Sequence, residues 1–157
     1  MTRDNIALVR IRKEIEQKLQ SIERVVSEYA SIPADTEGWV VLRTRASLLH
    51  DFYTGIERIC TRIAQELNGG IPQTEQWPHA LLQDMTLDLD EIRPPILSEE
   101  LYRDLLPYLK FRHLFRNLYG FELEWEKMKE LDRHFPDISA RWFGEIRTFL
   151  EWMKSVS

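Results

Sequence analysis

The stretch that decides the fold spans residues 42–67 and reads LRTRASLLHDFYTGIERICTRIAQEL. Apolar side chains recur in it at steps of three or four residues, from Leu42 to Leu67. This spacing places them on one face of an α-helix. Gly69-Gly70 follows directly and is typical of a helix end. We therefore expect one long helix here, beginning near Asp35.

A second long helix is expected in the preceding segment. From Ile6 to Tyr29, apolar residues again recur mostly at steps of three or four, with charged residues between them. Pro33 stops the pattern. Both helices exceed the usual length in globular proteins, and long helices that pack on each other are typical of helical bundles. No strand-type alternation of useful length is found, so the sequence predicts an all-α fold.

The segments that complete the bundle are shorter and are separated by proline or glycine. The expected ranges are 79–87 for a short helix, 98–118 for a fourth, 122–133 for a charged helical stretch and 138–153 for the last. Pro107 is expected to kink or break the fourth helix near residues 103–107, and Pro136 to interrupt the helical pattern. With about five to six helices, residues 1–157 are predicted to form a single compact domain.

The composition limits where and how the protein acts. The 157 residues carry a formal net charge of −5, so any contact with nucleic acid is expected to be confined to a patch. Cys60 is the only cysteine, which excludes an intrachain disulfide and fits a reducing compartment. The N-terminus lacks the apolar run of a signal peptide, and no stretch approaches the roughly 20 apolar residues of a bilayer span. We expect a cytoplasmic protein without membrane contact.

A cluster of cations interrupts this acidic chain at residues 110–121, which read KFRHLFRNLYGF. It contains Lys110, Arg112, His113 and Arg116 and no acidic residue. A local excess of positive charge in an acidic protein is typical of a site for a phosphate-bearing partner. These four residues are the candidates for binding an RNA phosphate.

Arg112 and Arg116 are the strongest pair in this cluster. They are four residues apart, so both fall on one face of a helix, where their forked donors suit a phosphate. The alternative is that they pair with acidic residues on a neighbouring helix, such as Glu57 or Asp51. Both interpretations stay open from the spacing alone.

Other candidate sites carry weaker signals. His50-Asp51 and His79 suit acid–base chemistry, but histidines on helices are more often surface or packing residues. No glycine-rich phosphate loop, no metal-spaced set of His, Asp and Glu, and no Ser-His-Asp arrangement is evident. We therefore expect neither a metal ion nor a cofactor.

The cationic cluster also carries a family resemblance. Arg112, Asn117 and Tyr119 are spaced as Arg-x4-Asn-x-Tyr, which resembles the Arg-x4-His-x-Tyr signature of the HEPN ribonuclease toxins, specifically the HepT-like group. Two longer stretches resemble the same group, HDFYTGIERI at 50–59 and YGFELEWEKM at 119–128. The order of the segments matches as well, from about residue 6 to 153.

The resemblance implies a compact helical bundle that forms a two-fold dimer, with the two signature segments at a shared cleft. It implies a metal-independent endoribonuclease that cuts RNA such as tRNA or mRNA and is encoded with a small nucleotidyltransferase antitoxin. That partner silences the toxin by attaching AMP to the signature tyrosine, here Tyr119. In this scheme Arg112 holds the scissile phosphate and residue 117 moves a proton, while Asp51 and Glu57 support the site.

Position 117 departs from the signature because it holds asparagine. An amide forms hydrogen bonds but does not titrate near neutral pH, so Asn117 is unable to act as a general acid or base. Such catalysis typically contributes about 10²–10⁴-fold. We therefore expect weak or absent cleavage, unless His113 one turn earlier substitutes. Asn117 is either a natural variant or a deliberate knock-out.

Two further alternatives remain beside an impaired ribonuclease. One is a non-catalytic helical module that docks a nucleotidyltransferase partner or holds RNA without cutting it. The other is a plain helical bundle with no role in nucleic-acid binding. Salt-dependent binding of RNA separates the first from the second.

Overall fold

The computed structural model describes residues 3–118 and 122–157 of the chain. Its helices are α1 (Arg3–Ser31), α2 (Trp39–Leu67), α3 (Trp77–Asp84), α4 (Glu99–Asn117), the short 3₁₀ turn η2 (Trp125–Lys127) and α5 (Lys129–Val156). No strand occurs in the described ranges, which confirms the predicted all-α bundle. No helix in these ranges combines the length and apolar character that crossing a membrane requires.

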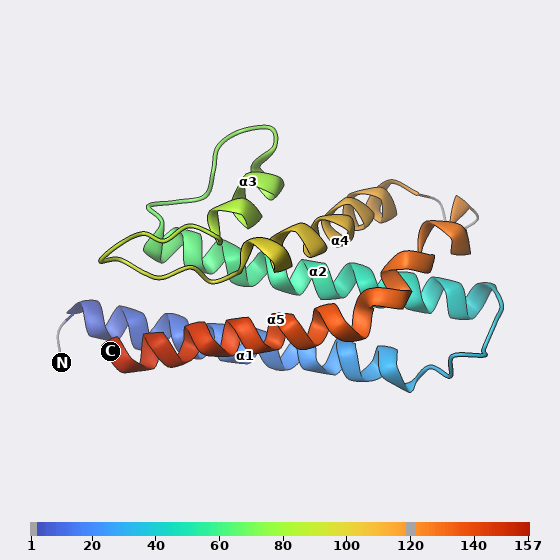
Figure 1. Cartoon of the computed structure of the whole chain (residues 1–157), viewed down its shortest axis with the longest axis horizontal. Coiled ribbons are helices and arrows are strands. Elements are labelled where there is room, and N and C mark those ends of the chain that lie inside the picture. Colours follow the sequence, from blue (N-terminus) through green and yellow to red (C-terminus); the bar gives the residue numbers. More distant parts are fainter. Residues whose placement is uncertain (1–2, 119–121) are drawn as a thin grey trace.

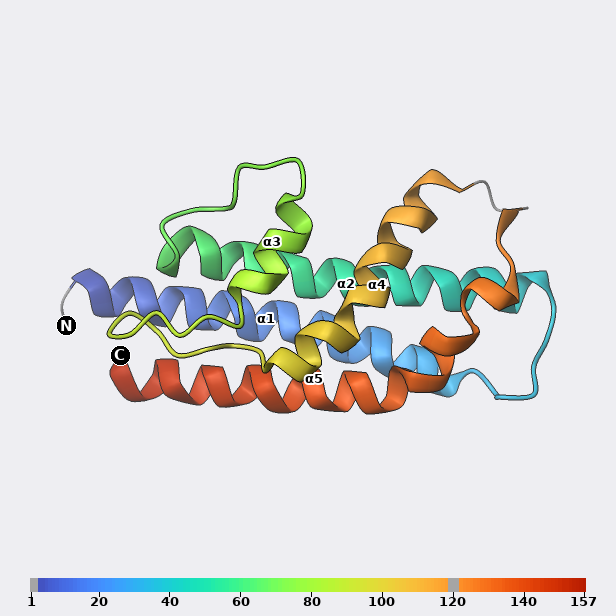
Figure 2. The same ribbon diagram turned by 45° about the horizontal axis from the view of Figure 1, so that its top comes forward.

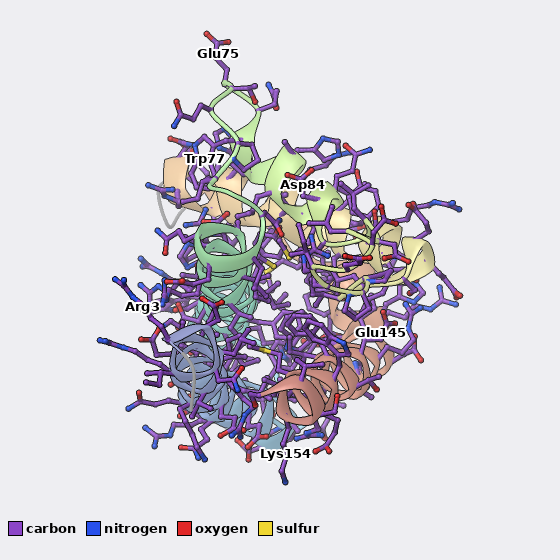
Figure 3. The ribbon with its side chains drawn as sticks, turned by 90° about the vertical axis from the view of Figure 1, so that its left-hand side faces the viewer. Arg3, Glu75, Trp77, Asp84, Glu145 and Lys154 are labelled. Atoms are coloured by element: carbon purple, nitrogen blue, oxygen red, sulfur yellow. The ribbon has the colours of Figure 1, made fainter. Side chains whose placement is uncertain are left out.

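Four helices surround the core. α1 lies beside both α2 and α5, and α4 contacts the same two helices from the other side (Figure 1). Seen along the bundle, side chains fill the space between α1, α2 and α5 (Figure 3). α1 and α2 approach closely at Gly55, where an added Cβ would lie 2.6 Å from Cγ1 of Ile22. A glycine at this point therefore sets the spacing between the two longest helices.

Aromatic rings from all four helices meet in the core. Phe135 of α5 lies with its ring centroid 4.7 Å from Tyr29 of α1 and 4.8 Å from Phe52 of α2. The Phe52 ring in turn lies 6.0 Å from Tyr108 of α4, edge to face. The buried hydroxyl of Tyr108 donates a hydrogen bond of 2.7 Å to the Leu131 carbonyl. These contacts fix α4 relative to α2, and they thereby position the cationic end of α4.

α4 begins as the sequence predicts and does not break. The Ser98 hydroxyl accepts a hydrogen bond from the Leu101 amide at 3.1 Å and caps the helix. Of the kink or break expected near residues 103–107, the break is wrong, because α4 continues through Pro107 to Asn117. Pro107 is exposed, so the backbone carbonyl that loses its partner there is available to water. The α4 ribbon bends along its length (Figure 2).

The last helix corrects two predictions. Residues 122–128 do not form the expected α-helix and include the short 3₁₀ turn η2. α5 starts at Lys129 and runs uninterrupted past Pro136. Phe135 before the proline and Ile138 after it are both buried, whereas Pro136 is exposed. One buried stripe therefore continues through the proline, and tertiary packing outweighs its local cost. The first turns of α5 are angled away from the rest (Figure 1).

The boundaries of α2 and α3 also differ from those expected. α2 begins at Trp39 and not near Asp35, because Gly38 before it has a φ of 115° that ends the helical pattern. The buried Arg45 donates hydrogen bonds to the Pro33 and Thr36 carbonyls at 2.9 and 3.3 Å, which orders this turn. α3 spans 77–84 in place of 79–87. The loop before it, with Glu75 at its tip, projects away from the bundle (Figure 3).

A buried arginine organises the connection between α3 and α4. The Arg93 side chain is 1% exposed and donates to the Asn68 side chain at 2.8 Å. It also donates to the carbonyls of Asp84, Leu87 and Pro94 at 2.9, 2.8 and 3.1 Å. Burial lowers the pKa of this guanidinium. Its hydrogen bonds tie the end of α2 to the connection that delivers α4.

We expect Arg93→Ala to lower the free energy of unfolding by about 3 kcal/mol or more, since it leaves several buried acceptors without a donor. Urea unfolding followed by circular dichroism measures this difference. Arg58→Ala is the matched control because Arg58 is exposed on α2, and its effect is expected to stay within about 0.5 kcal/mol. Equal effects of the two substitutions contradict the structural role of Arg93.

Candidate functional site

An open cleft lies between the first half of α2 and the end of α4. Its volume is about 760 Å³. Its residues come from α1, α2, α4 and the segment after it: Glu28, Arg43, Thr44, Ser47, Leu48, His50, Asp51, Phe115, Arg116, Leu118 and Leu123. The mixture of cationic, hydroxyl and apolar groups suits a ligand with both charge and a flat apolar surface.

Arg112 is turned away from this cleft and toward α2. Its Nε donates a hydrogen bond to Oγ1 of Thr54 at 2.9 Å, and its Nη2 lies 3.3 Å from Oε1 of Glu57. The side chains of Arg112 and Glu57 are only 17% and 10% exposed. The alternative in which Arg112 pairs with Glu57 is therefore correct for a single chain.

Glu57 is an unusual partner because half of its carboxylate lacks a hydrogen bond. Among the described residues, no group bonds to the buried Oε2 atom. Burial raises the pKa of Glu57, while the charges of Arg112 and Arg116 and the nearby His50 act in the opposite direction. The raised pKa means that burial outweighs the attraction of the two arginines.

Arg116 faces the cleft and does not share the close ion pair that Arg112 forms. It lines the cleft and is exposed, and it forms no ion pair or side-chain hydrogen bond with residues 3–118 or 122–157. Asp51 lies in the same cleft, but its carboxylate is next to His50. Phe111 and Phe115 pack together with ring centroids 5.9 Å apart and hold this end of α4 in place. Of the two arginines in the cationic cluster, Arg116 is therefore the one available to a phosphate, and the exposed Arg43 of α2 lines the same cleft.

The remaining residues of the cationic cluster point elsewhere. The Asn117 side chain donates to the His113 carbonyl at 2.8 Å, and both residues are exposed outside the cleft lining. Lys110 is exposed and likewise does not line the cleft. Tyr119 lies outside the described residues. A single chain therefore does not bring Arg112, Arg116 and Asn117 together around one point.

Sequence reasoning undervalued His50 and missed Thr54. The His50 ring lies 5.0 Å from the Phe115 ring, and its Nδ1 is 3.4 Å from Oδ1 of Asp51. Thr54 holds Arg112. Residues 50, 54 and 57 are spaced to share one face of α2. A search for apolar residues at helical spacing does not detect this face, because its side chains are polar.

No group of three or more His, Cys, Asp or Glu side chains in the described ranges is arranged to hold a metal ion. His79, the other histidine singled out, hydrogen-bonds through Nε2 to the Tyr102 hydroxyl at 2.7 Å. That contact joins α3 to α4 and gives His79 a structural role.

Fold and site together define a class of protein, an all-α bundle in which one helix end presents an arginine to an open cleft. The family model of HepT-like proteins matches residues 44–153, from the first half of α2 to the end of α5. The chain therefore belongs to the HepT-like family, as the resemblance predicted. No curated protein and no solved structure matches the chain.

The raised pKa of Glu57 predicts a pH-dependent effect of Glu57→Gln. The carboxyl group of the folded protein keeps its proton above the ordinary pKa of 4.5, so native stability contributed by this group is lost as pH rises through the folded pKa. Glutamine does not titrate. We therefore expect the free energy of unfolding of Glu57→Gln to increase relative to that of the unchanged chain as the pH rises from 4.5 to neutrality.

Urea unfolding at several pH values measures this gain. Glu151→Gln is the matched control, because Glu151 is exposed on α5 and forms no side-chain contact in the described structure. The free energy of unfolding of Glu151→Gln is expected to differ from that of the unchanged chain by the same amount at every pH. A stability difference for Glu57→Gln that shrinks with rising pH contradicts the raised pKa.

Proposed function

We propose that this HepT-like protein is the toxin component of a toxin–antitoxin pair and an endoribonuclease scaffold that binds tRNA or mRNA. The observation that carries the proposal is Arg116, an arginine that has no ion pair among residues 3–118 and 122–157 and faces an open cleft in a member of this family. A guanidinium offers forked donors that match phosphate oxygens. Exposed Ser47 and Thr44 beside it offer hydroxyl groups for ribose or phosphate.

The proposal includes a two-fold dimer. Within one chain Arg112 is paired with Glu57, and Asn117 lies outside the cleft. A second copy packed against the end of α4 doubles the number of Arg116 side chains along one surface. Lys110 and His113 are exposed on the same helix and extend that surface. RNA contact is therefore assigned to the dimer cleft formed by two α4 ends.

Asn117 makes cleavage by this chain slow. The family signature has histidine at this place, and an amide does not accept or release a proton near neutral pH. Arg116, which lines the cleft, still supplies positive charge to a transition-state phosphate. Regulation is assigned to a cytoplasmic nucleotidyltransferase antitoxin that attaches AMP to Tyr119.

A second function is a non-catalytic module that docks the nucleotidyltransferase or holds RNA. The pairing of Arg112 with Glu57 favours it, because that arginine is already neutralised in the free chain. Binding of RNA without any cleavage distinguishes this module from a nuclease.

We expect Arg116→Ala to weaken RNA binding and to lower its salt dependence. Each lost phosphate contact reduces the slope of log K against log salt by about 0.7 for single-stranded RNA. Fluorescence anisotropy with a labelled single-stranded RNA at several salt concentrations measures both quantities. The control is Arg103→Ala, an exposed arginine on α4 outside the cleft, which is expected to leave the slope unchanged. An unchanged slope for Arg116→Ala excludes the cleft as the RNA site.

Replacing Asn117 by histidine restores the family signature. The side chain is exposed, so the larger ring fits without disturbing the core. We expect Asn117→His to raise the rate of RNA cleavage by about 10²-fold or more. The control is Asn117→Gln, which keeps an amide and is expected to give no gain. The nuclease proposal is wrong if the histidine variant, expressed under tight control, cleaves no RNA.

A further inference from the structure

A polar seam runs between α2 and α4, next to the cleft. His50, Thr54 and Glu57 lie on one face of α2, and Arg112 of α4 bonds to the second and third of them. Two buried atoms in this seam lack a hydrogen-bond partner among the described residues, Nε2 of His50 and Oε2 of Glu57. Buried polar atoms are nearly always satisfied, so two orphans in one seam indicate a functional constraint.

His50 is the member of the seam that reaches the cleft. Its side chain is 21% exposed and lines the cleft together with Arg116. The ring packs against Phe115 with centroids 5.0 Å apart. Since Phe115 and Arg116 both line the cleft, this contact places the imidazole at the same cleft as the Arg116 guanidinium. A phosphate held by Arg116 therefore brings its ribose near His50.

The neighbours of His50 suit a proton carrier. Asp51 places a carboxylate oxygen 3.4 Å from Nδ1, which favours a proton on that nitrogen. The other nitrogen, Nε2, then carries a free lone pair and has no partner that occupies it. This pairing of a carboxylate with one ring nitrogen and a free second nitrogen is the arrangement that general bases use.

We infer that His50 is the proton acceptor for RNA cleavage by this chain, in place of the residue at position 117. The inference rests on the proposed ribonuclease function and names the residue that carries its residual activity. Nε2 is covered in the described conformation, so the imidazole has to turn toward the cleft when RNA binds.

The cleavage step balances without a co-reactant. The imidazole of His50 accepts the proton of a ribose 2′-hydroxyl, and the 2′-oxygen bonds to the adjacent phosphorus. The bond between phosphorus and the 5′-oxygen breaks, and that oxygen leaves with a proton returned by the imidazolium. Arg116 offsets the charge that develops on the phosphate. The products are a 2′,3′-cyclic phosphate and a 5′-hydroxyl end.

The test uses the full-length chain and a fluorophore-quencher RNA oligonucleotide, with the same oligonucleotide lacking 2′-hydroxyls as the blank. We expect His50→Gln to lower the cleavage rate by about 10²-fold or more. RNA affinity is expected to change less than about twofold, because glutamine keeps a hydrogen-bonding side chain. His134→Gln is the matched control, since His134 is exposed on α5 and does not line the cleft.

The double variant His50→Gln with Asn117→His guards against misfolding. If the single variant is folded but lacks a proton carrier, the signature histidine restores cleavage. A His50→Gln chain that cleaves as fast as the unchanged chain overturns the inference and leaves the nuclease proposal standing. The same holds if the unchanged chain binds RNA without cutting it while Asn117→His cuts. If neither chain binds or cuts RNA, the proposed function itself fails.

Discussion

The crossing of α4 over α2 determines where every candidate site residue lies. The Phe52 and Tyr108 rings hold the middle of the crossing, and the hydrogen bond and ion pair from Arg112 to Thr54 and Glu57 hold its polar end. Because Arg112 is used in this way, the next arginine on the helix is left to face the cleft. The contact of Arg112 with α2 thus makes Arg112 part of the fold and leaves Arg116 at the cleft, where a ligand can reach it.

Much of the fold follows from local patterns. The three- and four-residue steps of apolar side chains predict α1 and α2, and the Ser98 cap predicts the start of α4. The uninterrupted course of α5 does not follow from them. A proline is a strong local signal against a helix, and only the burial of Phe135 and Ile138 on either side of Pro136 overrides it. That burial depends on helices distant in sequence.

The site was harder to predict than the fold. The spacing of Arg112 and Arg116 suggests that the two share one role, yet one lies in a buried seam and the other in the cleft. Helical geometry predicts the angle between two side chains, but it does not predict which residue of another helix each side chain contacts. Glu57 was considered as a partner from its charge, while Thr54 offers no charge to notice. The sequence does not distinguish His50 from a packing or surface histidine, because an unsatisfied ring nitrogen is visible only in three dimensions.

Charge explains why a single cleft is a modest ligand site. Arg43 and Arg116 line it, but so do Glu28 and Asp51, and the formal charges cancel. The formal charges in the polar seam between α2 and α4 also cancel, since the charge of Glu57 offsets that of Arg112. Under the proposed function, RNA affinity would arise from the arginines that line the cleft and from their repetition by a second chain. Under the same proposal, the carboxylates of Glu28 and Asp51 would disfavour a nucleic-acid backbone whose phosphates do not meet the cleft arginines.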